Sequence, residues 1–117
     1  MIRNKTGVWG EIFAVRYLRD NGYEILCSNY VCRFGEIDII AKKDNAVSFV
    51  EVKTRNKKTE IRPMEAVDAG KRSRLEMTAK NFIAYMKTDA AMRFDVCEVY
   101  VDDSNKLTEI NYIENAF

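Results

Sequence analysis

Residues 35–55 read GEIDIIAKKDNAVSFVEVKTR, and this stretch contains two strand-like segments joined by a polar turn. Residues 36–42 and 47–54 are rich in Ile, Val and Phe, which favour β-strands. Asp44 and Asn45 between them suit the centre of a two-residue hairpin turn. The stretch therefore predicts an antiparallel β-hairpin whose two strands carry acids and a lysine.

Four charged side chains would gather on one face of this hairpin. A two-residue turn places Asp38 opposite Glu51 and Glu36 opposite Lys53. Side chains alternate along a strand, so all four lie on the same face. Directly opposed carboxylates destabilise a sheet, and we therefore expect a divalent cation between them. Hard oxygen ligands favour Mg²⁺, for which Mn²⁺ can substitute.

The rest of the chain supplies two helices and three further strands. Helical spacing of apolar residues, ended by Asn21-Gly22, predicts the first helix, and Pro63 suits the first turn of the second. The expected elements are a helix at 7–21, strands at 23–33, 36–42 and 47–54, a helix at 63–86, and strands at 92–101 and 107–113. The order αβββαββ, with the first three strands as an antiparallel meander, indicates an α/β fold.

The composition predicts one globular domain spanning residues 1–117 and narrows its chemistry. The chain is 47% hydrophobic and 32% charged, with a formal net charge of +1. It has no histidine, which excludes Ser-His, Cys-His and HExxH sites. Its three cysteines form no CxxC pair, and neither an apolar leader nor a run of about 18 apolar residues occurs. We expect a soluble cytoplasmic protein with no membrane partner.

Each helix places one charged residue beside its apolar stripe. Glu11, Val15 and Leu18 follow helical spacing, so Glu11 should border the sheet, where a glutamate is costly unless it is paired or ligated. Lys71 falls in the row Val67, Lys71, Leu75 and should border the buried face of the second helix. Either residue could instead be a half-exposed helix residue without a role in a site.

Asp38 followed by Glu51-Val52-Lys53 resembles the PD-(D/E)xK nuclease superfamily, although Ile37 stands where the superfamily name has proline. Over nearly its whole length the chain is similar to the YraN family of small bacterial proteins. The matching residues are Gly10-Glu11, Leu18, Gly22-Tyr23, Asn29, Gly35 to Asp38, Phe49 to Arg55, Lys71, Arg93 to Asp95 and Asn115 to Phe117. That family is in turn similar to archaeal Holliday junction resolvases.

This resemblance implies a restriction-endonuclease-like fold, with a central mixed β-sheet flanked by helices. It also implies that Glu11, Asp38 and Glu51 are metal-site acids and that Lys53 is the catalytic lysine, which orients or deprotonates the attacking water. Glu36 is a supporting candidate, because it could form an ion pair with Lys53. By analogy with resolvases, a homodimer is expected.

The expected activity is Mg²⁺-dependent hydrolysis of phosphodiester bonds in branched or otherwise structured DNA. Basic side chains would hold the DNA backbone through contacts that do not depend on base sequence. The candidates are Arg55, Lys57, Lys58, Lys71, Arg72 and Arg74.

Three alternatives stay open at the level of sequence. The chain could be a non-catalytic nucleic-acid-binding or accessory protein that retains a nuclease fold, as its near-neutral charge would suit. It could bind a metal for stability alone. The hairpin charges could also be ordinary salt bridges on a solvated sheet face, although the flanking apolar residues favour burial.

Overall fold

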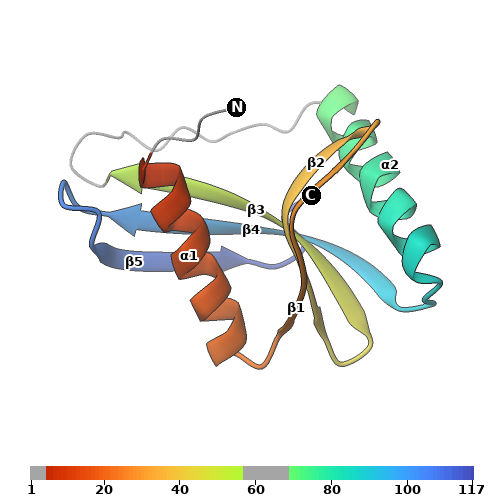
Figure 1. Cartoon of the computed structure of the whole chain (residues 1–117), viewed down its shortest axis with the longest axis horizontal. Helices are drawn as coiled ribbons and strands as arrows, with labels where there is room; N and C mark the ends of the chain where they lie inside the picture. The colour runs from red at the N-terminus through yellow and green to blue at the C-terminus, as the bar shows by residue number, and fades with distance from the viewer. Residues whose placement is uncertain (1–4, 57–68) are drawn as a thin grey trace.

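A computed structural model describes residues 5–56 and 69–117 (Figure 1). Within these ranges the chain forms two helices and one five-stranded sheet, which confirms the predicted α/β fold and its order. The elements are α1 (Lys5–Asp20), β1 (Glu24–Cys32), β2 (Gly35–Lys43), β3 (Ala46–Asn56), α2 (Ala69–Met86), β4 (Ala91–Val101) and β5 (Leu107–Ile113). The predicted start of the second helix near Pro63 lies outside the described residues. Within the described ranges, no helix is long and apolar enough to cross a membrane.

The sheet is mixed, and its strands lie in chain order from β1 to β5. The first three strands pair antiparallel, as the meander prediction required, and β4 pairs antiparallel with β5. Of the four strand pairs in the described part of the chain, only β3–β4 is parallel. A parallel pair needs a crossover connection such as the one containing α2. Lys43 pairs with Ala46 around a two-residue turn, so the predicted hairpin register is confirmed next to the turn.

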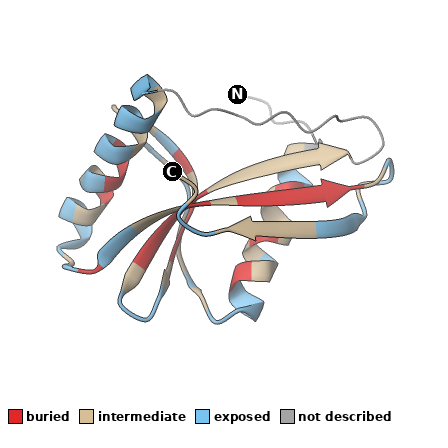
Figure 2. Ribbon diagram, turned by 180° about the vertical axis from the view of Figure 1, so that it is seen from behind, coloured by how far each residue is buried: buried red, intermediate tan, exposed pale blue. Residues whose placement is uncertain are grey.

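Two apolar clusters hold the helices against the sheet (Figure 2). Ala14 and Leu18 of α1 pack with Val50 and with buried residues of β4. Ala79 and Phe82 of α2 pack instead with Phe49 and with residues of β2. Side chains alternate along a strand, so β3 directs every second residue toward α2. This alternation sends Glu51 and Lys53 to the same side of β3 as Phe49.

Two glycines allow α1 to end and to approach the sheet. Gly22 has a φ of 86°, and the amides of Gly22 and Tyr23 donate to the carbonyls of Arg19 and Leu18, as in a Schellman cap. At the other end, a Cβ added to Gly10 would lie 1.8 Å from Oγ1 of Thr54. Glycine is therefore required where α1 crosses β3.

The β2 and β3 strands separate beyond the hairpin. Their ladder extends from Lys43–Ala46 to Ile39–Val50. Past this point β2 continues beside β1, whereas Glu51–Asn56 of β3 continue beside β4. Figure 1 shows the two strands diverging from the centre of the sheet. We call this divergence the fork. It opens the space in which Asp38 and Glu51 lie.

A buried polar network ties β4 to the C-terminal segment. The Asp95 carboxylate has no exposed surface, and it accepts hydrogen bonds from the Arg93 guanidinium, the Tyr112 hydroxyl and the Asn115 amide. Burial first, and then the hydrogen bond to Asp95, raises the pKa of Tyr112 well above its ordinary value. The network satisfies a carboxylate that would otherwise be costly to bury.

Candidate functional site

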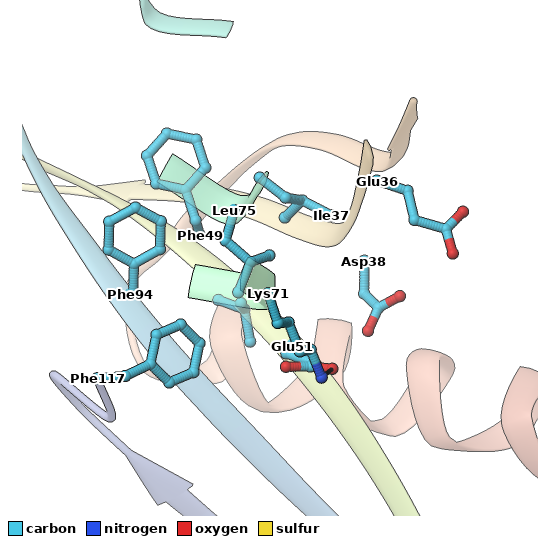
Figure 3. Close-up of a pocket in the computed structure, with 10 residues that line it drawn as sticks. Glu36, Ile37, Asp38, Phe49, Glu51, Lys71, Leu75, Phe94 and Phe117 are labelled. Atoms are coloured by element: carbon cyan, nitrogen blue, oxygen red, sulfur yellow. Dashed lines mark hydrogen bonds and ion pairs between the residues drawn. The ribbon is translucent and has the colours of Figure 1, made fainter. Parts of the chain in front are cut away.

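A pocket of about 280 Å³ occupies the fork (Figure 3). One side carries charged residues and the other carries aromatic rings. Its lining residues come from β2, β3, α2, β4 and the C-terminal segment: Glu36, Ile37, Asp38, Phe49, Val50, Glu51, Lys71, Leu75, Phe94 and Phe117. The pocket thus joins the predicted hairpin acids to residues from three other parts of the chain.

Asp38 is held in place by the backbone of the neighbouring strand. The amide of Val52 donates a hydrogen bond of 2.8 Å to Oδ2 of Asp38. The ladder has already ended at Ile39–Val50, so Asp38 and Glu51 do not form the directly opposed backbone pair expected from the hairpin alone. At Asp38 the backbone of β2 no longer pairs with β3, but the Asp38 side chain still contacts β3. Asp38 and Glu51 both line the pocket.

Two lysines converge on one oxygen of Glu51. The Nζ atom of Lys53 lies 3.1 Å from Glu51 Oε1, and the Nζ atom of Lys71 lies 3.0 Å from the same oxygen. The Glu51 side chain is 21% exposed, so these contacts are only partly screened by water. Lys53 lies on the same face of β3 as Glu51. Lys71 lies on α2, 20 residues further along the chain than Glu51.

The other two predicted acids have different surroundings. Glu36 is exposed, pairs in the sheet with Val31 of β1, and points outward in Figure 3. Glu11 is half-buried on α1, next to the contact between Gly10 and Thr54. Among residues 5–56 and 69–117, no three Asp, Glu or Cys side chains converge where they could share a metal ion. Asp38 and Glu51 are therefore the two acids that the pocket brings together in its charged half.

The predicted basic residues fall into three groups. Arg72 and Arg74 are exposed near the N-terminal end of α2. The Arg55 side chain is only 12% exposed, and its Nε lies 3.9 Å from Glu98 Oε2, so little of its guanidinium faces solvent. Lys57 and Lys58 lie outside the residues that the structure describes.

Sequence reasoning missed the aromatic side of the pocket. Phe49, Phe94 and Phe117 come from β3, β4 and the chain end, and no local spacing relates them. It placed Lys71 at the border of the buried face of the second helix, beside Leu75, and as a DNA-backbone contact, but it did not predict the contact of Lys71 with Glu51. Side chains that meet only in the tertiary structure leave no periodic pattern in the sequence.

The pocket's charges bear on what it can bind. Its lining includes three acidic residues and Lys71, and Lys53 contacts Glu51 beside it. The carboxylates of Asp38 and Glu51 would repel a phosphate group unless cations offset their charge. The carboxylates of Asp38 and Glu51 are hard oxygen ligands of the kind that Mg²⁺ uses when it binds through one or two acids and completes its shell with water and phosphate oxygens. The donor chemistry therefore fits Mg²⁺.

The fold and the pocket define a small α/β protein with a mixed sheet that forks around a charged cavity. The chain belongs to the UPF0102 family: the model described as "Uncharacterised protein family UPF0102" matches residues 10–99. This membership confirms the resemblance to the YraN family, which is the same family.

Full-length relatives support this membership. A "UPF0102 protein" of Caldicellulosiruptor bescii is 46% identical over 115 residues, which cover 97% of each chain. Another of Caldicellulosiruptor saccharolyticus is 44% identical over the whole of both chains. The "UPF0102 protein CA_C1763" of Clostridium acetobutylicum is 42% identical over 99% of this chain and 96% of its own.

Proposed function

We propose that the protein is a metal-dependent endonuclease that hydrolyses phosphodiester bonds in branched or otherwise structured DNA. The observation that carries this proposal is the meeting of Asp38 and Glu51, from two diverging strands, in a pocket where two lysines contact Glu51. A binding surface for DNA alone has no need of carboxylates in this position, because they repel phosphates.

Asp38 and Glu51 would hold Mg²⁺, and Mn²⁺ would substitute. When bound, the ion would polarise a phosphate oxygen and lower the pKa of a water molecule. The hydrogen bond from Val52 fixes the direction of the Asp38 carboxylate, so this ligand needs little reorganisation on binding. Glu11 remains a third proposed acid. It lies on α1, whose apolar stripe packs on the side of β3 opposite to the one that carries Phe49 and Glu51.

Lys53 is the proposed catalytic lysine. Its ammonium group contacts Glu51, so the charge lies beside one of the proposed metal ligands. From this position it can orient the attacking water or stabilise the charge that develops on the phosphate. Lys71 contacts the same carboxylate oxygen from α2 and supplies a second positive charge at the pocket. Glu36 would support the site from its outer edge.

The DNA backbone would lie along the N-terminal end of α2. Arg72 and Arg74 are exposed on this helix, which also places Lys71 in the pocket. Lys57 and Lys58 are proposed to add to this surface, whereas Arg55 would contribute less because its side chain is mostly buried against Glu98. Backbone contacts of this kind suit recognition of DNA shape. A homodimer would suit a two-fold-symmetric branched substrate.

The test is cleavage of labelled four-way junction, flap, duplex and single-stranded DNA in Mg²⁺, Mn²⁺ or EDTA. We expect metal-dependent cutting by the wild type and a loss of at least about 100-fold in Asp38→Asn, Glu51→Gln and Lys53→Met. Asp89→Asn changes an exposed acid outside the pocket and should cut like the wild type. Equal cutting by all variants would reveal a contaminating nuclease. Binding without cutting in every protein would favour a non-catalytic accessory role.

A further inference from the structure

We propose that the aromatic side of the pocket binds one unpaired nucleobase next to the phosphate that is cut. This inference rests on the proposed function and names its substrate class: DNA with an extrahelical or single-stranded nucleotide at the cleavage site. The proposal follows from three features of the pocket, which are its stacked rings, its size and its division into apolar and charged halves.

The rings form a continuous stack that leads into the pocket. Phe117 stacks on Phe94 with ring centroids 6.0 Å apart and planes 29° apart. Phe94 stacks in turn on Phe49 at 5.6 Å and 30°, and Phe82 meets Phe49 edge-on. Phe49 and Phe82 are buried, whereas Phe94 and Phe117 are partly exposed. Phe94 stacks with the ring of Phe49 and with that of Phe117, whereas Phe117 ends the stack and is the ring placed to contact a ligand.

The C-terminal segment holds the outermost ring in position. The amide of Ala116 donates a hydrogen bond of 2.8 Å to the carbonyl of Phe94. The preceding Asn115 amide donates to the buried carboxylate of Asp95. These two bonds fix the backbone of the two residues that precede Phe117, and the Phe117 ring also stacks on Phe94. The ring is therefore preorganised, which reduces the entropy lost when a ligand binds.

The size of the pocket favours one flat ring system. Its volume of about 280 Å³ is just below the roughly 300–1,000 Å³ typical of small-molecule sites. Leu75 and Ile37 complete an apolar half opposite the stacked rings. A flat aromatic ligand can stack there, whereas a base inside a duplex is covered on both faces and must first leave the helix.

The charged half of the pocket favours a nucleotide over other flat ligands, because a nucleotide carries a phosphate. Asp38, Glu51 and Lys71 line the same cavity as the rings, and Figure 3 shows them on the side away from the three phenylalanines. A nucleotide has this same division, with an apolar base at one end and a phosphate at the other. Aromatic stacking binds every base, so the pocket would select for an unpaired nucleotide without reading its sequence.

The test measures binding separately from cutting. Short DNA duplexes carry 2-aminopurine, a fluorescent base that is quenched when it stacks, either as a single unpaired base or in a base pair. Binding is measured in Mg²⁺, and a gel identifies the samples in which the DNA is still intact. The variants are Phe117→Leu and Phe94→Leu, which keep apolar volume but lose the ring, and Phe117→Trp, which restores a ring. Tyr85→Leu is the matched control, because Tyr85 is 78% exposed and does not line the pocket.

We expect the wild type to quench the unpaired 2-aminopurine and to bind this DNA roughly five- to 100-fold more tightly than the paired DNA, as one base–aromatic stack provides. Phe117→Trp and Tyr85→Leu should keep this preference. Phe117→Leu and Phe94→Leu should lose most of it, although thermal melting should show that both variants are still folded. No preference in the wild type, or full quenching in the Leu variants, would overturn the inference. Cutting without this binding preference would support the proposed endonuclease and refute the base pocket. The preference without cutting would support the base pocket and count against hydrolysis.

Discussion

The carboxylate of Asp38 accepts a hydrogen bond of 2.8 Å from the backbone amide of Val52, across the fork between β2 and β3. Asp38, the acid predicted from sequence as a metal ligand, therefore also accepts the bond that a backbone carbonyl of β2 would accept if the β2–β3 ladder continued. Because one side chain makes this bond and is also the proposed metal ligand, its charge and its hydrogen bond can be removed separately. This makes Asp38 a position where stability and activity can be distinguished.

Replacing Asp38 with asparagine or with alanine should give different results. Asn keeps an oxygen that can accept from Val52, so Asp38→Asn should change the free energy of unfolding by less than about 0.5 kcal/mol. Ala leaves the amide without this acceptor and should destabilise the protein by about 1–3 kcal/mol. Both variants should lose metal-dependent cleavage. Urea unfolding and cleavage assays on the two variants measure these effects, and equal stability in both would contradict a structural role for the bond.

Removing Lys71 should strengthen metal binding while it weakens DNA binding. Its ammonium group contacts Glu51 at 3.0 Å and so competes with a metal ion for that carboxylate. The Lys71 side chain is 37% exposed, so the pair contributes only about 0.2–1 kcal/mol, and Lys71→Met should bind Mn²⁺ roughly two- to fivefold more tightly. Titration calorimetry measures the affinity. Lys80→Met, an exposed position on the same helix, is the control, and weaker Mn²⁺ binding in Lys71→Met would refute the competition.

Gly10 and Thr54 should be strongly coupled in stability. A Cβ at position 10 would lie 1.8 Å from Oγ1 and 2.9 Å from Cβ of Thr54, so Gly10→Ala forces α1 away from β3. Overpacking of this kind typically destabilises a protein by about 1–3 kcal/mol. Thr54→Ala removes the nearest atom, and the double variant should recover part of the loss. Strictly additive effects in a double-mutant cycle would show that the helix adjusts elsewhere.

The free energy of unfolding should fall between pH 8 and pH 10 because of Cys97. Burial, followed by the charge of Glu98, raises the pKa of this thiol from 9.0 to about 12. The unfolded chain releases the proton first, so the stability provided by the protonated thiol is complete below pH 9 and is lost progressively up to about pH 12. The loss from this group should be about 1.4 kcal/mol at pH 10 relative to pH 8.

Urea unfolding at the two pH values in wild type and Cys97→Ala measures this contribution. Alanine will lower the stability at both pH values because it leaves a cavity, so the informative quantity is the difference between the two pH values. That difference should shrink in the variant. An unchanged difference would mean that the thiol is not the responsible group.

The hairpin could be predicted from local residues because its turn and its apolar strands determine it. Asp44 and Asn45 set the register, and the structure keeps that register as far as Ile39 and Val50. The fork could not be predicted from the hairpin, because it arises where β3 continues beside β4 and β2 continues beside β1. Pairing with β4, whose residues follow their partners in β3 by 45 positions, is not visible in a local pattern.

The pocket was predictable in part for the same reason. Asp38, Glu51 and Lys53 lie on one hairpin, so strand alternation and family resemblance both predicted them as a cluster, and the first two line the pocket. Lys71 and Phe117 reach the pocket from other elements, and only the packing of α2 and of the C-terminal segment brings them there. The expected convergence of Glu11 depended on how α1 sits on the sheet, which helical spacing alone does not determine.

The fork has a further consequence for the behaviour of the protein at high concentration. Beyond Val50, β4 is the only strand among residues 5–56 and 69–117 that pairs with β3. Within these ranges, the other edge of this half of β3 has no strand partner, although the Val52 amide donates to Asp38. Open edges invite pairing with another chain and aggregation, and inward-pointing charges are a common protection. Glu51, Lys53 and Arg55 alternate along this segment. The charges proposed for chemistry would thus also keep neighbouring molecules from adding a strand to the sheet.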